Sequence, residues 1–251
     1  MISAIVLTKN SASTLGRALK SLAWCDEIIV VDDDSADETA AIAKAHEAVL
    51  FNHLLNEDFA QQRNFGLSKA KSEWLLFVDS DEVVSSQLAE EIRRVVRISN
   101  DQYPMTNGYY VKRKDFVFGK WLEHGETANV KLLRLAKRDA GKWERSVHEV
   151  WDIHGHVGEL VNPLLHYPHP TVREFIDDIN WYSRINAKLL QKEGKKSSLF
   201  EIVFYPIAKF KQNYILRLGF LDGTPGILMA ILMSFHSFFT RAKLYLLWKK
   251  S

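Results

Sequence analysis

Short apolar runs alternate with amphipathic segments over the first hundred residues of the chain. The apolar runs predict buried strands over 2–7, 27–31, 48–51 and 73–79. Between them, apolar residues recur every three or four positions, which predicts helices over 14–22, 35–47 and 61–71. We expect a capping box of Ser35 with Glu38 to open the second of these helices. Strands that alternate with helices predict an α/β fold with a parallel sheet and right-handed crossovers.

The pattern changes twice further along the chain. Residues 101–170 are less periodic and rich in aromatic side chains, with strands predicted over 108–113, 116–121 and 130–135. From 171 to 251 the pattern is helical, beginning with a capping box of Thr171 with Glu174 and continuing with an apolar helix over 199–218. We therefore divide the chain into a ligand-binding part, 1–100, a substrate-binding and catalytic part, 101–170, and a helical appendage, 171–251.

Polar residues gather where the first, second and fourth strands end. These residues are Thr8 and Asn10, Asp32 and Asp33, and Asp79 and Asp81. Each alone is explained by turn chemistry, because Asn and Asp favour turns and helix caps. Three parallel strands, however, bring their carboxyl ends to one edge of the sheet, where such folds bind ligands. We therefore predict a shared ligand site there.

Asp79 and Asp81 follow four apolar residues and are separated by one position. Clustered carboxylates repel one another, and a divalent cation such as Mg²⁺ or Mn²⁺ would remove that conflict and bring phosphates with it. The alternative is an acidic turn in which Asp81 caps the next helix. His166 is a further candidate for a metal or phosphate ligand, with a hydrogen-bonded loop histidine as the alternative.

Glu149 is the candidate general base of the middle section. It stands beside His148 among aromatic residues, which is a setting where a carboxylate can take a proton from a hydroxyl. A single Glu is more often a surface or salt-bridged residue, and that alternative stays open.

The formal charge of +2 hides an asymmetry between the two ends of the chain. Residues 1–169 sum to −5 and residues 170–251 to +7. A basic, aromatic tail suits an anionic surface, either membrane or nucleic acid. Residues 223–240 carry no charge, which is borderline for a membrane span. Ser234, Ser237 and Arg241 form a narrow polar face, so a helix lying in the membrane interface fits better. We expect residues 199–250, which include both apolar helices, to dock on an anionic membrane surface; an ordinary helical pair or self-association are the alternatives.

Two further features of the sequence concern cysteine chemistry and the expected cellular location. The single cysteine, Cys25, excludes an intrachain disulfide and a cysteine zinc site. The first residues enter a strand without a basic leader, which favours a cytoplasmic protein, held peripherally at the inner face of the cell membrane.

With these residues in place, the chain resembles the family 2 inverting glycosyltransferases with the GT-A fold. The matching motifs are 5–10, 31–39, 63–66 and 79–82. Further blocks at 147–149, 166–167 and 219–223 are similar to a bacterial subgroup that includes the lipopolysaccharide inner-core β-glucosyltransferases. Ser11 departs from the pattern, since many members have Glu there. The Gln/Arg-x-x-Arg-Trp helix of processive synthases is missing as well, which argues against a polymerising enzyme.

The resemblance implies a role for each matching residue. Thr8, Asn10, Asp32 and Asp33 would line the pocket for the nucleotide base and ribose. Arg63 and Asn64 would approach the nucleotide or its phosphates. Asp79 and Asp81 resemble the DxD motif, which holds Mn²⁺ or Mg²⁺ against the diphosphate of the nucleotide sugar. Glu149 would be the base.

The function expected from this resemblance is metal-dependent, inverting transfer of a sugar from a nucleotide sugar such as UDP-hexose. The acceptor would be a hydroxyl of a cell-surface glycan or lipid-linked glycan such as lipopolysaccharide core. One alternative is a sugar-1-phosphate nucleotidyltransferase, although the residues Thr8 to Ser11 are not its glycine-rich loop. The other is a non-catalytic membrane adaptor, which leaves the acidic strand ends unexplained. We expect no nucleic-acid partner.

Overall fold

The computed structural model describes residues 1–98, 105–128, 130–146, 149–168 and 171–250. The chain forms two compact units. The first consists of Met1–Arg113 and Lys131–His166, and the second of Lys114–Val130 and Tyr167–Ser251. The sections 1–100 and 101–170 separated above therefore both lie mainly in the first unit.

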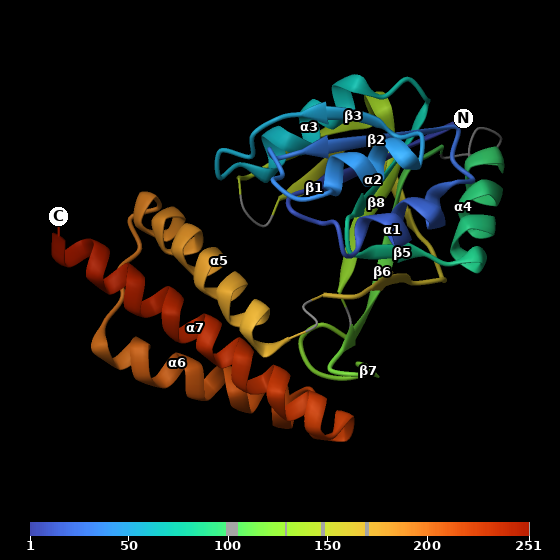
Figure 1. Cartoon of the computed structure of the whole chain (residues 1–251). Helices are drawn as coiled ribbons and strands as arrows, with labels where there is room; N and C mark the ends of the chain where they lie inside the picture. The colour runs from blue at the N-terminus through green and yellow to red at the C-terminus, as the bar shows by residue number, and fades with distance from the viewer. Residues whose placement is uncertain (99–104, 129, 147–148, 169–170, 251) are drawn as a thin grey trace. The chain divides into compact units, whose positions relative to one another are not determined.

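The first unit is built on a mixed sheet (Figure 1). Four parallel strands stand in the order β3 (Val49–Asn52), β2 (Glu27–Asp32), β1 (Ile2–Thr8) and β4 (Trp74–Asp79). These confirm the predicted strands and their parallel pairing. The sheet continues through β8 (Lys131–Lys137), β6 (Thr106–Val117), β12 (Leu164–His166) and β5 (Glu82–Val84), with β7 (Lys120–Trp121) and β11 (His156–Glu159) paired to β6.

Apolar side chains cover both faces of the parallel part of the sheet. In β1, Ala4 and Val6 face one core, whereas Ile5 and Leu7 face the other. The first core is closed by α1 (Leu15–Leu22), α2 (Thr39–Ala45) and α4 (Ser86–Ile98). The second is closed by α3 (Phe59–Lys69) and the hairpin of β9 (Gly141–Glu144) and β10 (Val150–Ile153). Burial on both faces explains why these strands read as unbroken apolar runs.

Helix α3 lies very close to the sheet at Gly66. A Cβ atom at this position would come within 2.6 Å of Ile5 Cγ2, so a larger residue would push the helix away. This close approach fixes the height of α3 above β1, and α3 carries Arg63 and Asn64.

The predicted capping box of Ser35 with Glu38 is wrong. Helix α2 begins only at Thr39, and no side chain caps it at Glu38. Ser35 instead donates its hydroxyl to Asp32 Oδ1 at 2.6 Å and accepts the Asn10 N–H at 2.8 Å. The strand-end residues therefore use Ser35 to shape their own turn, and that outweighs the local capping pattern.

The second unit is a group of three helices, α5 (Val172–Lys192), α6 (Leu199–Lys211) and α7 (Thr224–Lys250). Helices α5 and α6 both pack against α7 (Figure 1). The capping box of Thr171 with Glu174 is confirmed at the start of α5. The helix predicted over 199–218 is α-helical only to Lys211 and continues as a π-helical turn over Gln212–Leu216.

The apolar core of this unit joins the end of β6 and the following loop to α5 and α7. Its buried members are Val117, Leu122, Phe175, Ile179, Met229 and Leu232. Within the described part of the chain, α7 is the single helix whose length and composition would allow it to cross a membrane, and part of it is buried inside the protein. Buried residues such as Ala230 and Leu244 tie α7 to the other helices.

Candidate active site

The ends of β1, β2 and β4 lie side by side, as the sequence predicts. Thr8 is the register partner of Asp32, and Leu7 is the partner of Asp79. The polar residues of these strand ends therefore occupy one edge of the sheet in the first unit. This edge also receives Arg63 from α3 and Arg134 from β8.

Asp32 organises the first two strand ends from a buried position. Its side chain is 2% exposed and accepts hydrogen bonds from the Thr8 hydroxyl at 2.8 Å and from the Ser35 N–H at 2.8 Å. Asn10 adopts a left-handed conformation, φ 48°, and its Oδ1 accepts the Ala36 N–H at 2.9 Å. Thr8, Asp32 and Asn10 therefore shape the loops around the expected nucleotide pocket.

Asp33 is more open than Asp32, with a side chain 19% exposed. Its Oδ1 accepts the Leu55 N–H at 2.8 Å, and its Oδ2 lies 3.6 Å from Lys9 Nζ. Of the two neighbouring aspartates, Asp33 is therefore the better placed to meet a ligand.

A row of alternating charges crosses the end of β4. Arg63 Nη2 lies 2.9 Å from Asp79 Oδ1, and the same nitrogen lies 2.9 Å from Glu149 Oε1. Arg134 forms an ion pair with the other oxygen of Asp79 and lies 3.1 Å from Glu82 Oε1. Two buried arginines thus link three carboxylates into one network.

The network fixes the ionisation of its two inner carboxyls in opposite directions. Burial would raise the pKa of Asp79, but Arg134 and Arg63 outweigh burial and hold that pKa well below its usual range. Burial raises the pKa of Glu82, and the charge of Asp79 adds to this effect, while Arg134 opposes it. Asp79 is therefore the firmly ionised member, and any proton held inside the network lies on Glu82.

Arg134 was not among the residues singled out from the sequence. It stands in the apolar run Leu132 to Leu135 of β8, and its guanidinium is 4% exposed. A charged residue in the middle of a buried strand has to be paired, since an isolated buried charge is very unfavourable. An arginine within an apolar strand of the sequence could therefore have indicated that Arg134 pairs with carboxylates.

Asn64 does not face the strand ends. Its Nδ2 donates to the Trp143 carbonyl at 2.8 Å, and its Oδ1 accepts the Trp143 N–H at 2.9 Å. Asn64 therefore ties α3 to β9, and its neighbour Arg63 stacks within 4.7 Å of the Trp143 ring. Both polar atoms of the Asn64 side chain are thus bonded within the protein, and its contact with the nucleotide stays a prediction.

Of the three predicted metal ligands, the structure brings two together. Asp81 Oδ2 lies 3.3 Å from His166 Nε2, and the side chains are 30% and 12% exposed. Asp79, in contrast, is held by the two arginines. Over the residues that the structure describes, no group of three His, Cys, Asp or Glu side chains is arranged to hold a metal ion. Asp81 and His166 are thus the pair of predicted metal ligands that the structure brings within reach of each other.

Glu149 lies immediately before β10, with a side chain 18% exposed. Its Oε1 accepts from Arg63 Nε at 2.9 Å, so the carboxylate is oriented by the residue that also holds Asp79. Its expected neighbour His148 lies outside the described residues. Within the network of arginines and carboxylates, Glu149 lies next to β10 and keeps part of its side chain exposed to solvent. An acceptor hydroxyl could approach it there, which suits a general base.

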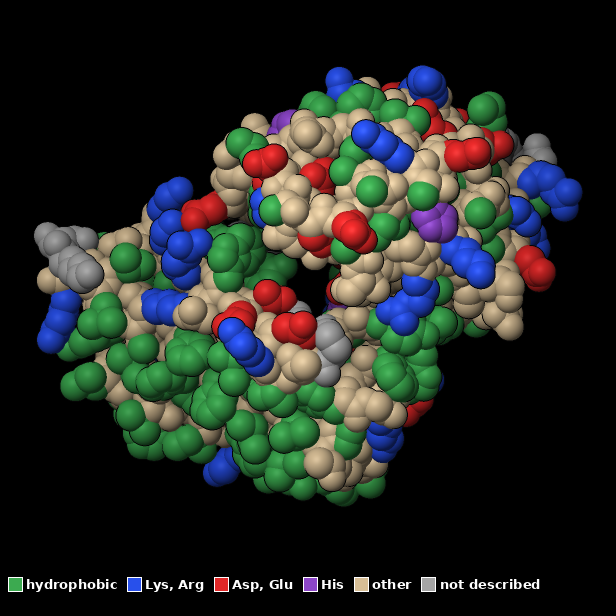
Figure 2. Space-filling model, viewed as in Figure 1, with side chains coloured by type: hydrophobic (Ala, Val, Ile, Leu, Met, Phe, Trp, Pro, Cys, Tyr) green, Lys and Arg blue, Asp and Glu red, His purple; other side chains and the backbone are tan. Residues whose placement is uncertain are grey.

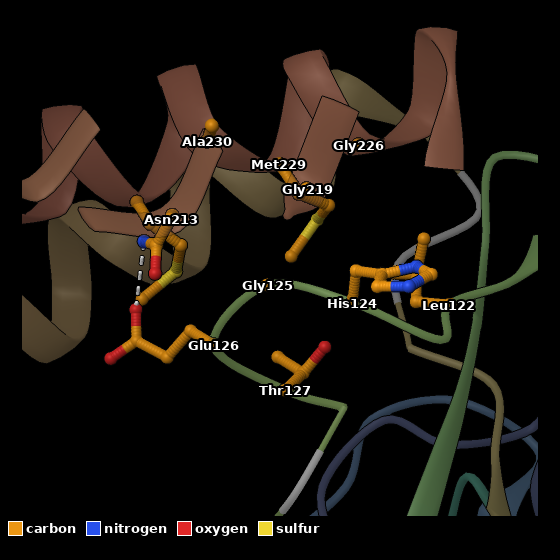
Figure 3. Close-up of a pocket in the computed structure, with 11 residues that line it drawn as sticks. Leu122, His124, Gly125, Glu126, Thr127, Asn213, Gly219, Gly226, Met229 and Ala230 are labelled. Carbon is orange, nitrogen blue, oxygen red and sulfur yellow. Dashed lines mark hydrogen bonds between the residues drawn. The ribbon is translucent and has the colours of Figure 1, made fainter. Parts of the chain in front are cut away.

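The second unit contains a small pocket between the loop after β7 and the helices (Figure 3). Glu126 accepts hydrogen bonds there from Asn213 Nδ2 at 3.2 Å and from Lys209 Nζ at 2.6 Å. Nearby, Asp222 accepts the N–H groups of Glu123 and His124 at 3.1 and 2.8 Å. The motif 219–223 thus anchors this loop through Asp222. At Gly226 a Cβ atom would lie 1.9 Å from the Gly219 carbonyl oxygen, so only glycine fits there.

Comparison with known proteins identifies the family. Residues 3–145 match the family model described as Glycosyl transferase family 2. The chain is 27% identical to the lipopolysaccharide core biosynthesis glycosyltransferase LpsC of Rhizobium meliloti, over 97% of this chain and 92% of LpsC. It is 30% identical to an uncharacterized glycosyltransferase of Rickettsia felis, over 97% of this chain and 89% of that protein.

Comparison of structures gives the same fold. The crystal structure of S. aureus TarS 1–349 in complex with UDP-GlcNAc superposes with a TM-score of 0.53 over 99% of this chain and 91% of TarS. The two sequences are 16% identical, so this likeness shows the GT-A type of fold alone. Because the family model covers more than half of the chain and the relatives align with nearly all of it, the chain belongs to glycosyl transferase family 2 and is a glycosyltransferase.

Proposed function

We propose that this glycosyltransferase moves a hexose from a UDP-sugar to a hydroxyl of a lipopolysaccharide core glycan or a related glycolipid, with inversion at the anomeric carbon. The observation that carries the proposal is the bridge that Arg63 makes between Asp79 and Glu149 beside the Asp81–His166 pair. It puts a charged binding group, a candidate base and a candidate metal pair at one sheet edge. The similarity to LpsC over 97% of the chain supports a lipopolysaccharide acceptor.

In this mechanism Glu149 takes the proton of the acceptor hydroxyl. The hydroxyl oxygen forms a bond to the anomeric carbon on the face opposite the diphosphate, whose carbon–oxygen bond breaks. A hydroxyl is a poor nucleophile, and a positioned carboxylate contributes about 10²–10⁴-fold to such a step. Arg63 keeps the Glu149 carboxylate in place while the acceptor approaches. A single displacement of this kind needs no second carboxylate nucleophile.

Arg63 has a second role in the proposal, on the donor side. Its Nη1 is buried and has no hydrogen-bond acceptor among the described residues. A buried guanidinium N–H without an acceptor is unfavourable unless a ligand supplies one. We assign this donor to an oxygen of the sugar nucleotide, which would reach it once the side chains that enclose Arg63 move on binding. Asp33 and Asn10 would then border the base and ribose at the neighbouring strand ends.

Asp81 and His166 would hold the divalent ion, Mn²⁺ or Mg²⁺. When bound, such an ion stabilises the negative charge that develops on the leaving diphosphate by several kcal/mol. Asp81 would supply a carboxylate oxygen, the type of ligand that suits these ions, and His166 would supply an imidazole nitrogen beside it. Asp79 remains an ionised partner of the arginines and orients them toward the donor.

We further propose that the enzyme works at the cytoplasmic face of the cell membrane, where a glycolipid acceptor is presented, and that it is held there peripherally. The net charge of +7 in residues 170–251 and the apolar helix α7 support this location. The family assignment leaves no support for the nucleotidyltransferase or for the non-catalytic adaptor.

The proposal is tested by measuring release of UDP from a panel of UDP-sugars, with and without Mn²⁺, and with purified lipopolysaccharide core as acceptor. We expect one donor to be turned over in an acceptor- and metal-dependent manner. Nuclear magnetic resonance of the product gives the anomeric configuration, which should be opposite to that of the donor. Turnover that is equally fast without a divalent ion, or a product with retained configuration, would contradict the mechanism.

A further inference from the structure

Helix α6 leaves its apolar side chains exposed. None of its residues is buried. Phe200, Val203, Phe204 and Ile207 lie three or four positions apart and are 64%, 55%, 50% and 48% exposed. The rings of Phe200 and Phe204 stack on each other at 4.2 Å. Apolar residues with this helical spacing normally form a face that is buried against a protein core. The exposed face of α6 therefore indicates a contact with a partner.

Two further apolar residues that follow the α-helix are exposed as well. Leu216 is 77% exposed and Leu221 is 53% exposed. We call the side chains of Phe200, Val203, Phe204, Ile207, Leu216 and Leu221 the apolar ridge. Figure 2 shows hydrophobic side chains gathered over this part of the second unit. Soluble monomers rarely expose large apolar patches, and those that they do expose mark protein or membrane contacts.

The charges beside the apolar ridge are of one sign. Residues 195–251 contain nine Lys and Arg and two Asp and Glu, 9 − 2 = +7. Both acidic residues already have partners within the protein. Glu201 forms the capping box with Ser198 at the start of α6, and Asp222 accepts the Glu123 N–H. Lys195, Lys196, Lys211 and Arg217 are exposed at the two ends of α6. An apolar helix face with basic ends is the pattern of a helix that lies in the interface of an anionic membrane.

We propose that the apolar ridge docks this enzyme on the surface of an anionic phospholipid bilayer, with α6 lying in the interface and α7 supporting it from behind. The proposal rests on the glycolipid acceptor of the proposed function and adds the face that meets the membrane. It narrows the sequence-based expectation, which placed both helices of residues 199–250 at the membrane, to the exposed face of α6.

Two observations favour the bilayer over other arrangements. Helix α7 uses Met229, Ala230 and Leu232 to pack within the helical group, so crossing a bilayer would require those contacts to open. A second copy of the chain meeting the first through the apolar ridge would bring the basic ends of the two α6 helices together. Like charges facing each other across an interface are unfavourable, whereas anionic lipid would neutralise them.

The test is co-sedimentation of the full chain with vesicles of phosphatidylcholine alone or mixed with phosphatidylglycerol. The test variant is the triple substitution Phe200→Ser, Phe204→Ser and Ile207→Ser. Val161→Ser is the matched control, since Val161 is 83% exposed and lies in the first unit. We expect wild type and control to sediment with the mixed vesicles, and the triple variant to lose at least tenfold in partitioning. Circular dichroism verifies that the variant keeps its helices.

Four outcomes would overturn the proposal. The first is wild-type protein that stays in the supernatant with the mixed vesicles at low salt, and the second is a triple variant that binds like wild type. The third is protein that alkaline carbonate fails to release from the vesicles, because that indicates a spanning α7. Analytical ultracentrifugation adds a fourth, a dimer that the triple variant converts to a monomer.

Donor turnover in solution separates this proposal from the proposed function. The triple variant should hydrolyse or transfer from its UDP-sugar as fast as wild type when the acceptor is a soluble core oligosaccharide. If vesicle binding fails while turnover persists, the docking face alone is refuted. If the ridge binds vesicles but no UDP-sugar is turned over, the proposed function fails instead.

Discussion

Arg63 holds Glu149 in place through two nitrogens of one guanidinium: Nε and Nη2 both lie 2.9 Å from Glu149 Oε1. Both contacts are to the same carboxylate oxygen, so Arg63 orients the group through Oε1. Such an arrangement suits a base that needs a fixed direction and one oxygen for the acceptor proton.

Replacing Glu149 by Gln should lower kcat by about 10²–10⁴-fold and leave the affinity for the donor nearly unchanged. Gln keeps an oxygen for Arg63 but has no site for the proton. Steady-state kinetics of transfer and calorimetric titration of the donor measure the two quantities. Glu144→Gln, an exposed carboxylate in the same hairpin, serves as the control. Lost donor binding with an unchanged kcat would make Glu149 a binding residue and direct attention to Asp152.

Asp81→Ala should abolish divalent-dependent turnover while the protein stays folded. The side chain lies beyond the end of β4, is 30% exposed, and contacts His166, so its loss removes a metal ligand without opening the core. A Mn²⁺ titration of turnover, together with a melting curve, measures both effects. The matched control is Asp139→Ala, whose side chain is 90% exposed. Near-normal turnover across the titration would refute the role of Asp81 in holding the ion.

Asn64→Ala should destabilise the first unit by about 1–3 kcal/mol, because the backbone N–H and carbonyl of Trp143 would lose their partners. The urea midpoint of unfolding gives the change. Gln61→Ala, at an exposed position of the same helix, should leave the midpoint in place. An unchanged midpoint for Asn64→Ala, with weakened donor binding, would return Asn64 to the nucleotide site.

The parallel strands and their polar ends could be predicted from the sequence because both depend on local patterns. Unbroken apolar runs indicate strands buried on both faces, and parallel pairing then brings Thr8, Asp32 and Asp79 to one edge. The network behind that edge could not be predicted in the same way. Arg134 lies 55 residues from Asp79 along the chain, and Asn64 lies 79 residues from Trp143.

Which helix of the second unit stays uncovered could not be predicted from the sequence, for a different reason. An apolar stripe with helical spacing predicts one covered face, but it does not say which of several helices remains uncovered. The uncharged run of α7 is partly buried by its neighbours, whereas α6, which is also rich in apolar residues, has no buried residue. Only the packing of three helices decides that outcome.

The carboxylate of Asp222 should make the second unit more stable at neutral pH than in acid. Burial would raise the pKa of this carboxyl, but hydrogen bonds from the His124 backbone and ring and from the Glu123 N–H outweigh burial and lower the pKa below its ordinary value. A carboxyl with a lowered pKa in the folded state stabilises the protein above its unfolded pKa, about 4. The stabilisation is lost as the pH falls through the lower, folded pKa.

Asp222→Asn tests whether the charge of Asp222 stabilises the second unit, because the amide keeps the size of the side chain but carries no charge. Melting temperatures of wild type and variant should differ most near neutral pH and converge as the pH falls below about 4. The control is Asp139→Asn, an exposed carboxyl, for which no such convergence is expected. A gap between wild type and Asp222→Asn that stays constant across the whole pH range would show that shape, and not the carboxylate charge, anchors the loop at Glu123 and His124.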